Sequence, residues 1–147
     1  MKTIILLFLI GFSLSYNAGA AVNYARTYCQ NYNPNYANYR NSGGDCANFV
    51  SQCMIAGGMN FRNCGGWVDG HGCLPAVADL KSCLQQKGWK HSYNRPASFK
   101  AGYPIFSTQY SHAMLATGIS GGSVIFCGHT NDRCDSTISS NIEYYYE

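Results

Sequence analysis

The sequence predicts an α+β fold in which N-terminal helices pack on a C-terminal antiparallel sheet. Before Gly88, three segments carry apolar residues three and four positions apart, which is the spacing of one helix face. After Gly88, the pattern changes to short β-rich runs that are separated by turn residues. Helices followed by an antiparallel meander are typical of the α+β class, and 147 residues fit one domain with one core.

The chain opens with a segment that is typical of a secretory signal peptide. Lys2 gives a positively charged start, an almost unbroken apolar run follows from Thr3 to Leu14, and Ser15 offers a small residue for cleavage. The run is shorter than the roughly 20 residues that a membrane-spanning helix needs, and an uncleaved anchor is the alternative. We therefore expect a signal peptide over residues 1–15, a mature domain over residues 16–147 and a secreted, extracellular protein.

The first predicted helix runs from Ala20 to about Gln30, and a loop rich in Asn, Tyr and Gly follows over residues 31–44. A second helix begins at Asp45, an N-cap residue whose carboxylate can accept the free N–H groups of the first turn. Gly57-Gly58 ends this helix. Its buried stripe consists of Cys46, Phe49, Val50 and Cys53.

A glycine-rich surface loop over residues 60–72 is expected next. A third helix spans about Pro75 to Lys87, with Gly88 as its end. Ser120-Gly121-Gly122 predicts a hairpin between the last two strands. The predicted strands are Trp89–Tyr93, Pro104–Ser107, His112–Ile119 and Ser123–His129.

The composition excludes partners that are recognised by charge alone. The net charge of +3 falls to about +2 without Lys2, which is too weak a field for nucleic acid or a membrane surface. Charged residues make up only 12%, so the surface is expected to be polar but mostly uncharged. We expect a monomer without cofactor or metal, whose partner is a substrate bound in a site.

Eight cysteines in an exported chain of this size predict disulfides. If Cys46 is a free thiolate, parity leaves at least one more cysteine unpaired within the chain. Cys53, two helical turns farther along the same stripe, is expected to be that buried thiol. The others allow up to three bridges, and the sequence-local pairs Cys64–Cys73 and Cys127–Cys134 are favoured among them. These others are Cys29, Cys64, Cys73, Cys83, Cys127 and Cys134.

Cys46 has the position of a catalytic nucleophile. At the opening of a helix, unpaired N–H groups and the helix dipole favour a thiolate, and comparable cysteines have pKa values of roughly 3.5–7.5 instead of about 8.5. The same N–H groups, that of Cys46 above all, face the position where the oxyanion of a tetrahedral intermediate would develop. The alternative is that Cys46 is one more half-cystine.

The base for such a nucleophile would be one of four histidines, His71, His91, His112 and His129. His112 is the best placed, because it opens a predicted strand from whose edge an imidazole can project over a helix N-terminus. His129 ends the neighbouring hairpin strand and could orient the His112 ring through its second nitrogen. Asn131 and Asp132, just beyond it, could do the same.

These residues lie in motifs that resemble a known family. The stretch Gly43 to Cys53, with Asp45-Cys46 at its centre and Ala56-Gly57-Gly58 behind it, resembles the putative amidase domain family. This family is a branch of the papain-like superfamily close to the NlpC-type and CHAP-type cell-wall hydrolases. The resemblance covers most of the mature chain. Further similar segments are Ala25-Arg26 and residues 33–36 (first helix and loop), residues 110–114 (histidine strand) and residues 129–133 (closing motif).

The resemblance implies a papain-like cysteine hydrolase with a triad of Cys46, His112 and a polar third residue. His129 stands where relatives carry His, Asn or Glu, and Asn131 is held in reserve for this role. Related peptidases use an upstream Tyr or Gln as the second oxyanion donor, and the candidates here are Tyr36, Tyr39 and Asn41. Two features depart from the family: the unusually many cysteines, and Gly102-Tyr103-Pro104 where Gly-Asp usually precedes a strand.

The function that the resemblance implies is hydrolysis of an amide or peptide bond by acyl transfer, with bacterial peptidoglycan peptide as substrate. A second hypothesis is a disulfide-rich secreted binding module without catalysis, in which Cys46 is oxidised. A third is a zinc site of Cys64, His71 and Cys73, with Cys83 as a further ligand, although this spacing matches no zinc-finger pattern well.

Overall fold

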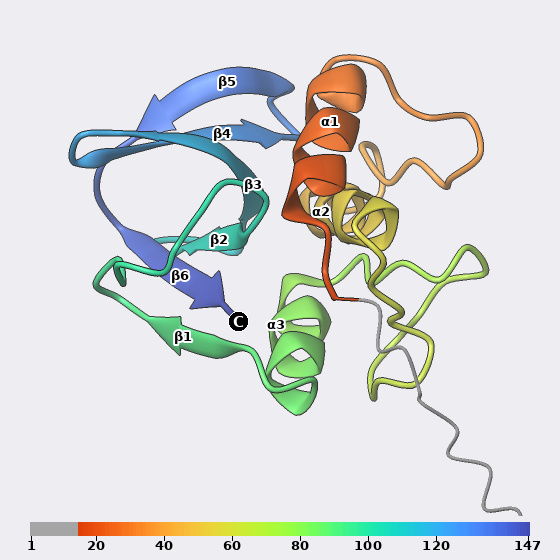
Figure 1. Cartoon of the computed structure of the whole chain (residues 1–147). Helices are drawn as coiled ribbons and strands as arrows, with labels where there is room; N and C mark the ends of the chain where they lie inside the picture. The colour runs from red at the N-terminus through yellow and green to blue at the C-terminus, as the bar shows by residue number, and fades with distance from the viewer. Residues whose placement is uncertain (1–14) are drawn as a thin grey trace, which may run out of the picture.

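The computed structural model describes residues 15–147, and over this range three helices precede six strands (Figure 1). The predicted α+β order is confirmed, whereas the predicted signal peptide lies outside the described residues except for Ser15. The helices are α1 (Ala18–Tyr28), α2 (Cys46–Ala56) and α3 (Val77–Gln86). The strands are β1 (Lys90–Ser92), β2 (Pro104–Ser107), β3 (Ala113–Ser120), β4 (Ser123–Gly128), β5 (Arg133–Ile138) and β6 (Ile142–Tyr146).

The six described strands form one antiparallel sheet in the order β1-β6-β2-β3-β4-β5. The last strand of the chain, β6, is therefore inserted between β1 and β2. The helices lie together beside the sheet, and α1 and α2 both pack against β3 (Figure 1). Because α2 lies against β3, the beginning of the helix and the beginning of the strand are brought close together.

Strands β5 and β6 are missing from the sequence prediction. β5 is the edge strand and buries none of its residues fully, so its sequence lacks a strong apolar signal. β6 is almost wholly buried in the sheet interior, so its sequence does not alternate between apolar and polar residues. Only its β-branched and aromatic composition, Ile-Glu-Tyr-Tyr-Tyr, could have identified it.

Helix α2 runs through the middle of the molecule, and every residue from Cys46 to Met54 is buried. The predicted apolar stripe is therefore confirmed, but the helix also buries polar side chains. Ser51 forms hydrogen bonds with the backbone of Leu74, and Gln52 accepts one from the Tyr24 hydroxyl at 2.8 Å. These partners make the burial of the polar groups tolerable, since an unpaired one would cost about 1–3 kcal/mol.

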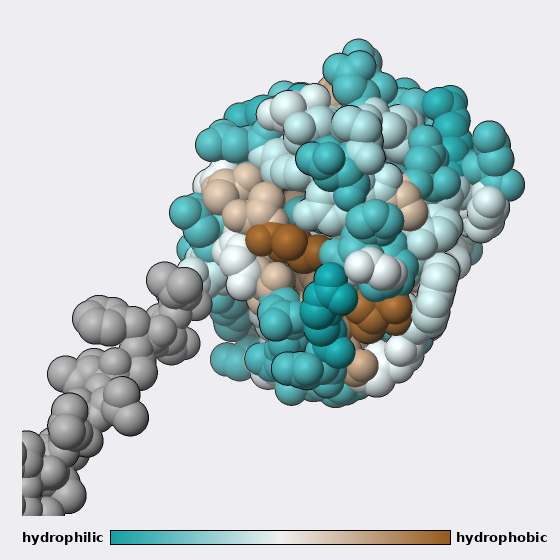
Figure 2. Space-filling view, turned by 90° about the vertical axis from the view of Figure 1, so that its right-hand side faces the viewer, coloured by the Kyte–Doolittle hydropathy of each residue, from teal (hydrophilic) through white to brown (hydrophobic). Residues whose placement is uncertain are grey.

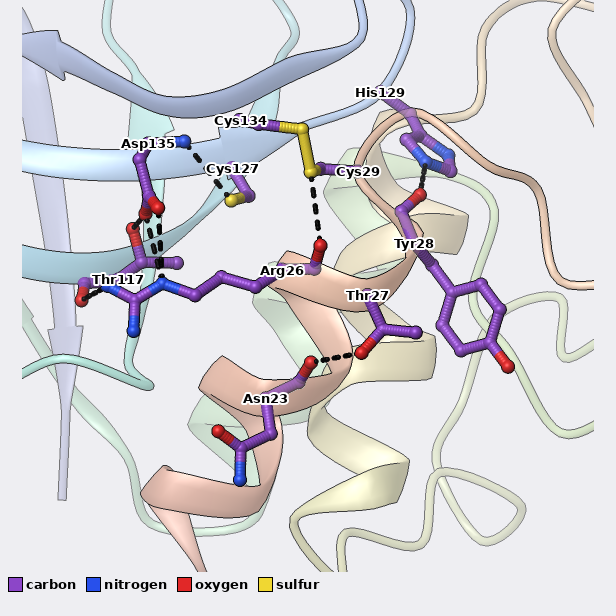
Figure 3. Close-up of a disulfide and its surroundings, with 10 residues drawn as sticks. All are labelled: Asn23, Arg26, Thr27, Tyr28, Cys29, Thr117, Cys127, His129, Cys134 and Asp135. Atoms are coloured by element: carbon purple, nitrogen blue, oxygen red, sulfur yellow. Dashed lines mark hydrogen bonds and ion pairs between the residues drawn. A yellow bond between two sulfur atoms is a disulfide. The ribbon is translucent and has the colours of Figure 1, made fainter.

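Two disulfides join distant parts of the chain. Cys29 at the end of α1 is bonded to Cys134 in β5 (Figure 3), and Cys64 is bonded to Cys83 in α3. The favoured pairs Cys64–Cys73 and Cys127–Cys134 are therefore wrong, because tertiary packing and not sequence proximity sets the pairing.

The proposed zinc site is also wrong, since two of its ligands, Cys64 and Cys83, form a disulfide and residues 15–147 contain no metal-binding group. The free cysteines, all buried, are Cys46, Cys53, Cys73 and Cys127, which confirms the prediction for the first two.

The surface is mostly polar, as the composition predicts. Figure 2 shows a face on which hydrophilic residues predominate and apolar patches are small. Within residues 15–147, no helix has the length and apolar character that crossing a membrane would require.

Candidate active site

Cys46 is the first residue of α2, and its side chain is almost completely buried. Three backbone N–H groups act to lower the pKa of its thiol, those of Ala113, Ala47 and Cys46 itself. Ala113 directly follows His112 in the chain. The fold thus brings the start of α2 near the backbone that follows the predicted base, although 66 positions separate Cys46 and His112 in the sequence.

Burial sets the protonation of both groups. Burial raises the pKa of the Cys46 thiol although the three N–H groups act in the opposite direction, and the neighbouring Asp45 carboxylate raises it further. The predicted lowering of this pKa is therefore wrong, because loss of hydration outweighs the effect of the helix N-terminus. Burial also lowers the pKa of the His112 imidazole. At neutral pH, these directions favour a neutral thiol on Cys46 and a neutral imidazole on His112.

His112 lines a cavity of about 350 Å³ together with residues of β3, β4 and β5. Asn131, the reserve candidate for the third residue, and Arg133 line the same cavity. Gly128 on β4 is a neighbour of the ring: a Cβ atom at this position would lie 3.9 Å from His112 Nε2, an ordinary van der Waals contact. His112 and Asn131 therefore share the walls of one cavity.

His129 does not orient His112, contrary to the sequence prediction. Its Nδ1 lies 2.6 Å from the Asp45 carboxylate and its Nε2 lies 2.7 Å from the Tyr28 carbonyl oxygen, so both ring nitrogens are occupied. Asp132 is also engaged elsewhere, since its carboxylate accepts a hydrogen bond from Tyr32 and forms an ion pair with Arg40. Of the residues predicted to orient His112, only Asn131 shares its cavity.

Asp45 is the N-cap residue of α2, as predicted. The prediction that its carboxylate accepts the N–H groups of the first turn is wrong, because its side chain forms no capping hydrogen bond. Its carboxylate is fully buried and accepts hydrogen bonds from the Tyr39 N–H and the Asn48 side-chain amide, both at 2.8 Å, and from His129. The Asp45 side chain therefore does not occupy the N–H groups of the first turn, and those of Cys46 and Ala47 act to lower the pKa of the Cys46 thiol.

The three candidate oxyanion donors all precede Cys46, and no described hydrogen bond joins their side chains to it. The Tyr39 hydroxyl donates to Asp69 at 3.0 Å, and burial and this bond raise its pKa to about 12. Burial likewise raises the pKa of Tyr36, whose ring lies 6.0 Å from that of His71. Asn41 is exposed.

Two further cavities adjoin the candidate site. One of about 270 Å³ is lined by Gly43 and Gly44, just ahead of Asp45-Cys46, together with Tyr39 and Trp67. The larger cavity, of about 420 Å³, lies between α3 and β2 and reaches Ser111, the residue before His112. Its walls contain aromatic rings, hydroxyl groups, the Gln85 amide and the Lys81 ammonium group. Each cavity is thus lined by a residue within two positions of a candidate catalytic residue, Gly44 for Cys46 and Ser111 for His112.

Sequence reasoning missed the connections of Asp45 and His129. The two residues are 84 positions apart, and Tyr28 lies 101 positions from His129, so no local pattern could join them. The sequence motifs contain both residues, Asp45 in the Asp-Cys dipeptide and His129 in the closing motif, but they do not predict a contact between the two.

Comparison with known proteins gives one match. A family model described as a putative amidase domain matches residues 15–101, which is more than half of the chain. The matched range contains α1, α2, α3 and Cys46 and ends before His112. No curated protein and no solved structure matches the chain significantly.

Proposed function

Because the chain belongs to the putative amidase domain family, whose description indicates hydrolysis of amide bonds, we propose that it is a cysteine amidase or peptidase with Cys46 as nucleophile and His112 as base. One observation carries this proposal: the Cys46 sulfur lies at the start of α2, and the backbone N–H of Ala113, the residue after His112, is close enough to act on the pKa of its thiol. A cysteine at a helix start and a histidine directly before a strand that packs on this helix fit the order of papain-like enzymes, and we extend the proposal to that fold and to kinship with NlpC-type and CHAP-type hydrolases.

The proposed reaction starts from the neutral pair. As the Cys46 sulfur attacks the carbonyl carbon and an S–C bond forms, the thiol proton passes to His112, so a free thiolate need not accumulate. The N–H groups of Cys46 and Ala47 are available to the oxyanion, because the Asp45 side chain does not occupy them. His112 then protonates the leaving amine as the C–N bond breaks. Water hydrolyses the thioester, which releases the acid and restores the thiol.

Asn131 takes the role of third residue in this proposal. It lines the cavity of His112, whereas His129 has no free ring nitrogen. An amide oxygen that accepts from the second ring nitrogen would hold the imidazole in the tautomer that can take the thiol proton.

The proposed substrate is peptidoglycan peptide outside the cell. The likeness of the sequence motifs to cell-wall hydrolases supports the substrate class, and the cavities lined by Gly44 and by Ser111 offer room for a branched polar chain. The signal-like N-terminal segment and two disulfides support export, since disulfides persist in oxidising compartments. The alternative of a binding module requires an oxidised Cys46, and this cysteine is free.

The decisive test compares the protein with Cys46→Ala on purified peptidoglycan, with mass spectrometry of the released fragments and newly formed amines. Loss of the nucleophile should lower the release rate by about a thousandfold or more. Cys127→Ala is the matched control, because it removes another buried free thiol that contacts the backbone of Asp135 in β5. Equal release by the unsubstituted protein and Cys46→Ala would refute the proposal.

A further inference from the structure

We propose that His129 is a positioning residue held as a buried imidazolium, whose ion pair with Asp45 fixes the backbone that carries Cys46 and offsets the Asp45 charge beside the sulfur. This role rests on the proposed function of Cys46. It differs from the role of a third catalytic residue, because the His129 side chain is 1% exposed and has no nitrogen left for substrate or for His112.

The hydrogen-bond partners of His129 determine its protonation. A neutral imidazole has one donor nitrogen and one acceptor nitrogen, whereas an imidazolium has two donors. Here Nδ1 faces the Asp45 carboxylate at 2.6 Å and Nε2 faces the Tyr28 carbonyl oxygen at 2.7 Å. A carbonyl oxygen and a carboxylate both accept, so both contacts are satisfied when the ring carries two protons. The only other arrangement that satisfies both contacts has the proton of Nδ1 on the Asp45 carboxyl group, so that both side chains are neutral.

Two helix ends favour the charged arrangement. The Tyr28 carbonyl lies at the C-terminal end of α1, where the helix dipole stabilises a cation, and Asp45 lies at the N-terminus of α2, where the dipole stabilises an anion. Asp45 also accepts two further N–H donors, from Tyr39 and Asn48, which stabilise a carboxylate. Figure 3 shows the His129 ring directed at the Tyr28 carbonyl, close to the Cys29–Cys134 disulfide that ties this end of α1 to β5.

The ring is also fixed by packing on both faces. Phe49 of α2 stacks on it at a centroid distance of 3.9 Å, and Tyr32 stacks on it at 4.2 Å. Both aromatic faces can stabilise a cation. The next residue, Thr130, accepts a hydrogen bond from the backbone N–H of Asp45 at 3.2 Å. His129 and Thr130 therefore hold Asp45 by both its side chain and its backbone, one residue before the nucleophile.

Removing the imidazole should change the chemistry of Cys46 in a way that depends on charge. The Asp45 carboxylate raises the pKa of the Cys46 thiol, and without His129 its buried charge would have no cationic partner. His129→Gln should therefore lower the alkylation rate of Cys46 at a fixed alkaline pH by about tenfold. The double variant Asp45→Asn with His129→Gln removes the unpaired charge and should recover most of that rate. His71→Gln, an exposed histidine away from Cys46, is the control.

The protonation itself is measured on the unsubstituted protein by NMR with ¹⁵N-labelled histidine at neutral pH, and His129→Gln assigns the signals. The expected result is two protonated ring nitrogens on His129, each with a slowly exchanging proton. A single protonated nitrogen, or an unchanged Cys46 alkylation rate in His129→Gln, would overturn the proposal. Neither measurement needs a substrate, so failure of the amidase assay and failure of this inference are told apart.

Discussion

The disulfide between Cys29 and Cys134 should contribute more to the stability of the fold than the one between Cys64 and Cys83. The first closes a loop of 105 positions and the second a loop of 19. The chain-entropy relation for loop closure gives about 4.8 kcal/mol for the first and about 3.2 kcal/mol for the second at room temperature. The expected difference of about 1.6 kcal/mol is large relative to a domain stability of about 5–15 kcal/mol.

The assay is urea unfolding of two double variants, Cys29→Ala with Cys134→Ala and Cys64→Ala with Cys83→Ala, each compared with the unsubstituted protein. Each removes a pair of sulfurs from a largely buried site, so the cavity terms partly cancel. The first variant should have the lower free energy of unfolding and a larger slope with urea, because its unfolded state is less constrained. If the second variant loses as much stability as the first, loop length does not govern the contribution of these bonds.

The protonation of Cys46 gives a second prediction: because burial raises the pKa of its thiol, iodoacetamide should label it slowly near neutral pH, and the rate should rise through a midpoint above 9.0. A rate that has reached its plateau at about pH 7 would show a preformed thiolate and contradict the neutral resting pair. A third prediction concerns Gly102, which has φ +94° and where a Cβ atom would lie 2.4 Å from the Ala18 carbonyl oxygen. Gly102→Ala should lower the free energy of unfolding by about 3 kcal/mol, and Gly58→Ala, with similar φ but open space, by about 1 kcal/mol; equal losses in thermal unfolding would refute the steric argument.

The features that depend on neighbours in sequence could be predicted. The three helices, the turn glycines after α2 and α3 and the place of Cys46 at a helix start all follow from periodicity and capping rules. Cys53 as a buried free thiol followed from the same helical stripe. The β-strand that opens beside His112 was also predicted, to within one residue at each end.

The features that depend on tertiary contacts could not be predicted. Cys134 and Cys29 are brought together by β5, an edge strand whose sequence gives little sign of it. The pKa of Cys46 was predicted in the wrong direction because the helix N-terminus is visible in the sequence, whereas the degree of burial is not. His129 was assigned to His112 because one opens a predicted strand and the other ends the neighbouring strand, but Asp45 before α2 and Tyr28 of α1 are the partners of its ring nitrogens.

The direction of the Asp45 side chain links the fold to the proposed chemistry. An aspartate at a helix N-cap normally binds the free N–H groups of the first turn, and those are the groups that an oxyanion next to Cys46 would need. In this fold, Tyr39, Asn48 and His129 bind the Asp45 carboxylate, so it does not compete for them. The remaining disadvantage is a negative charge near the sulfur, and a cation on His129 counters it. The buried contact between Asp45 and His129 therefore explains how an aspartate can directly precede the proposed nucleophile without blocking the donors that the proposed reaction would require.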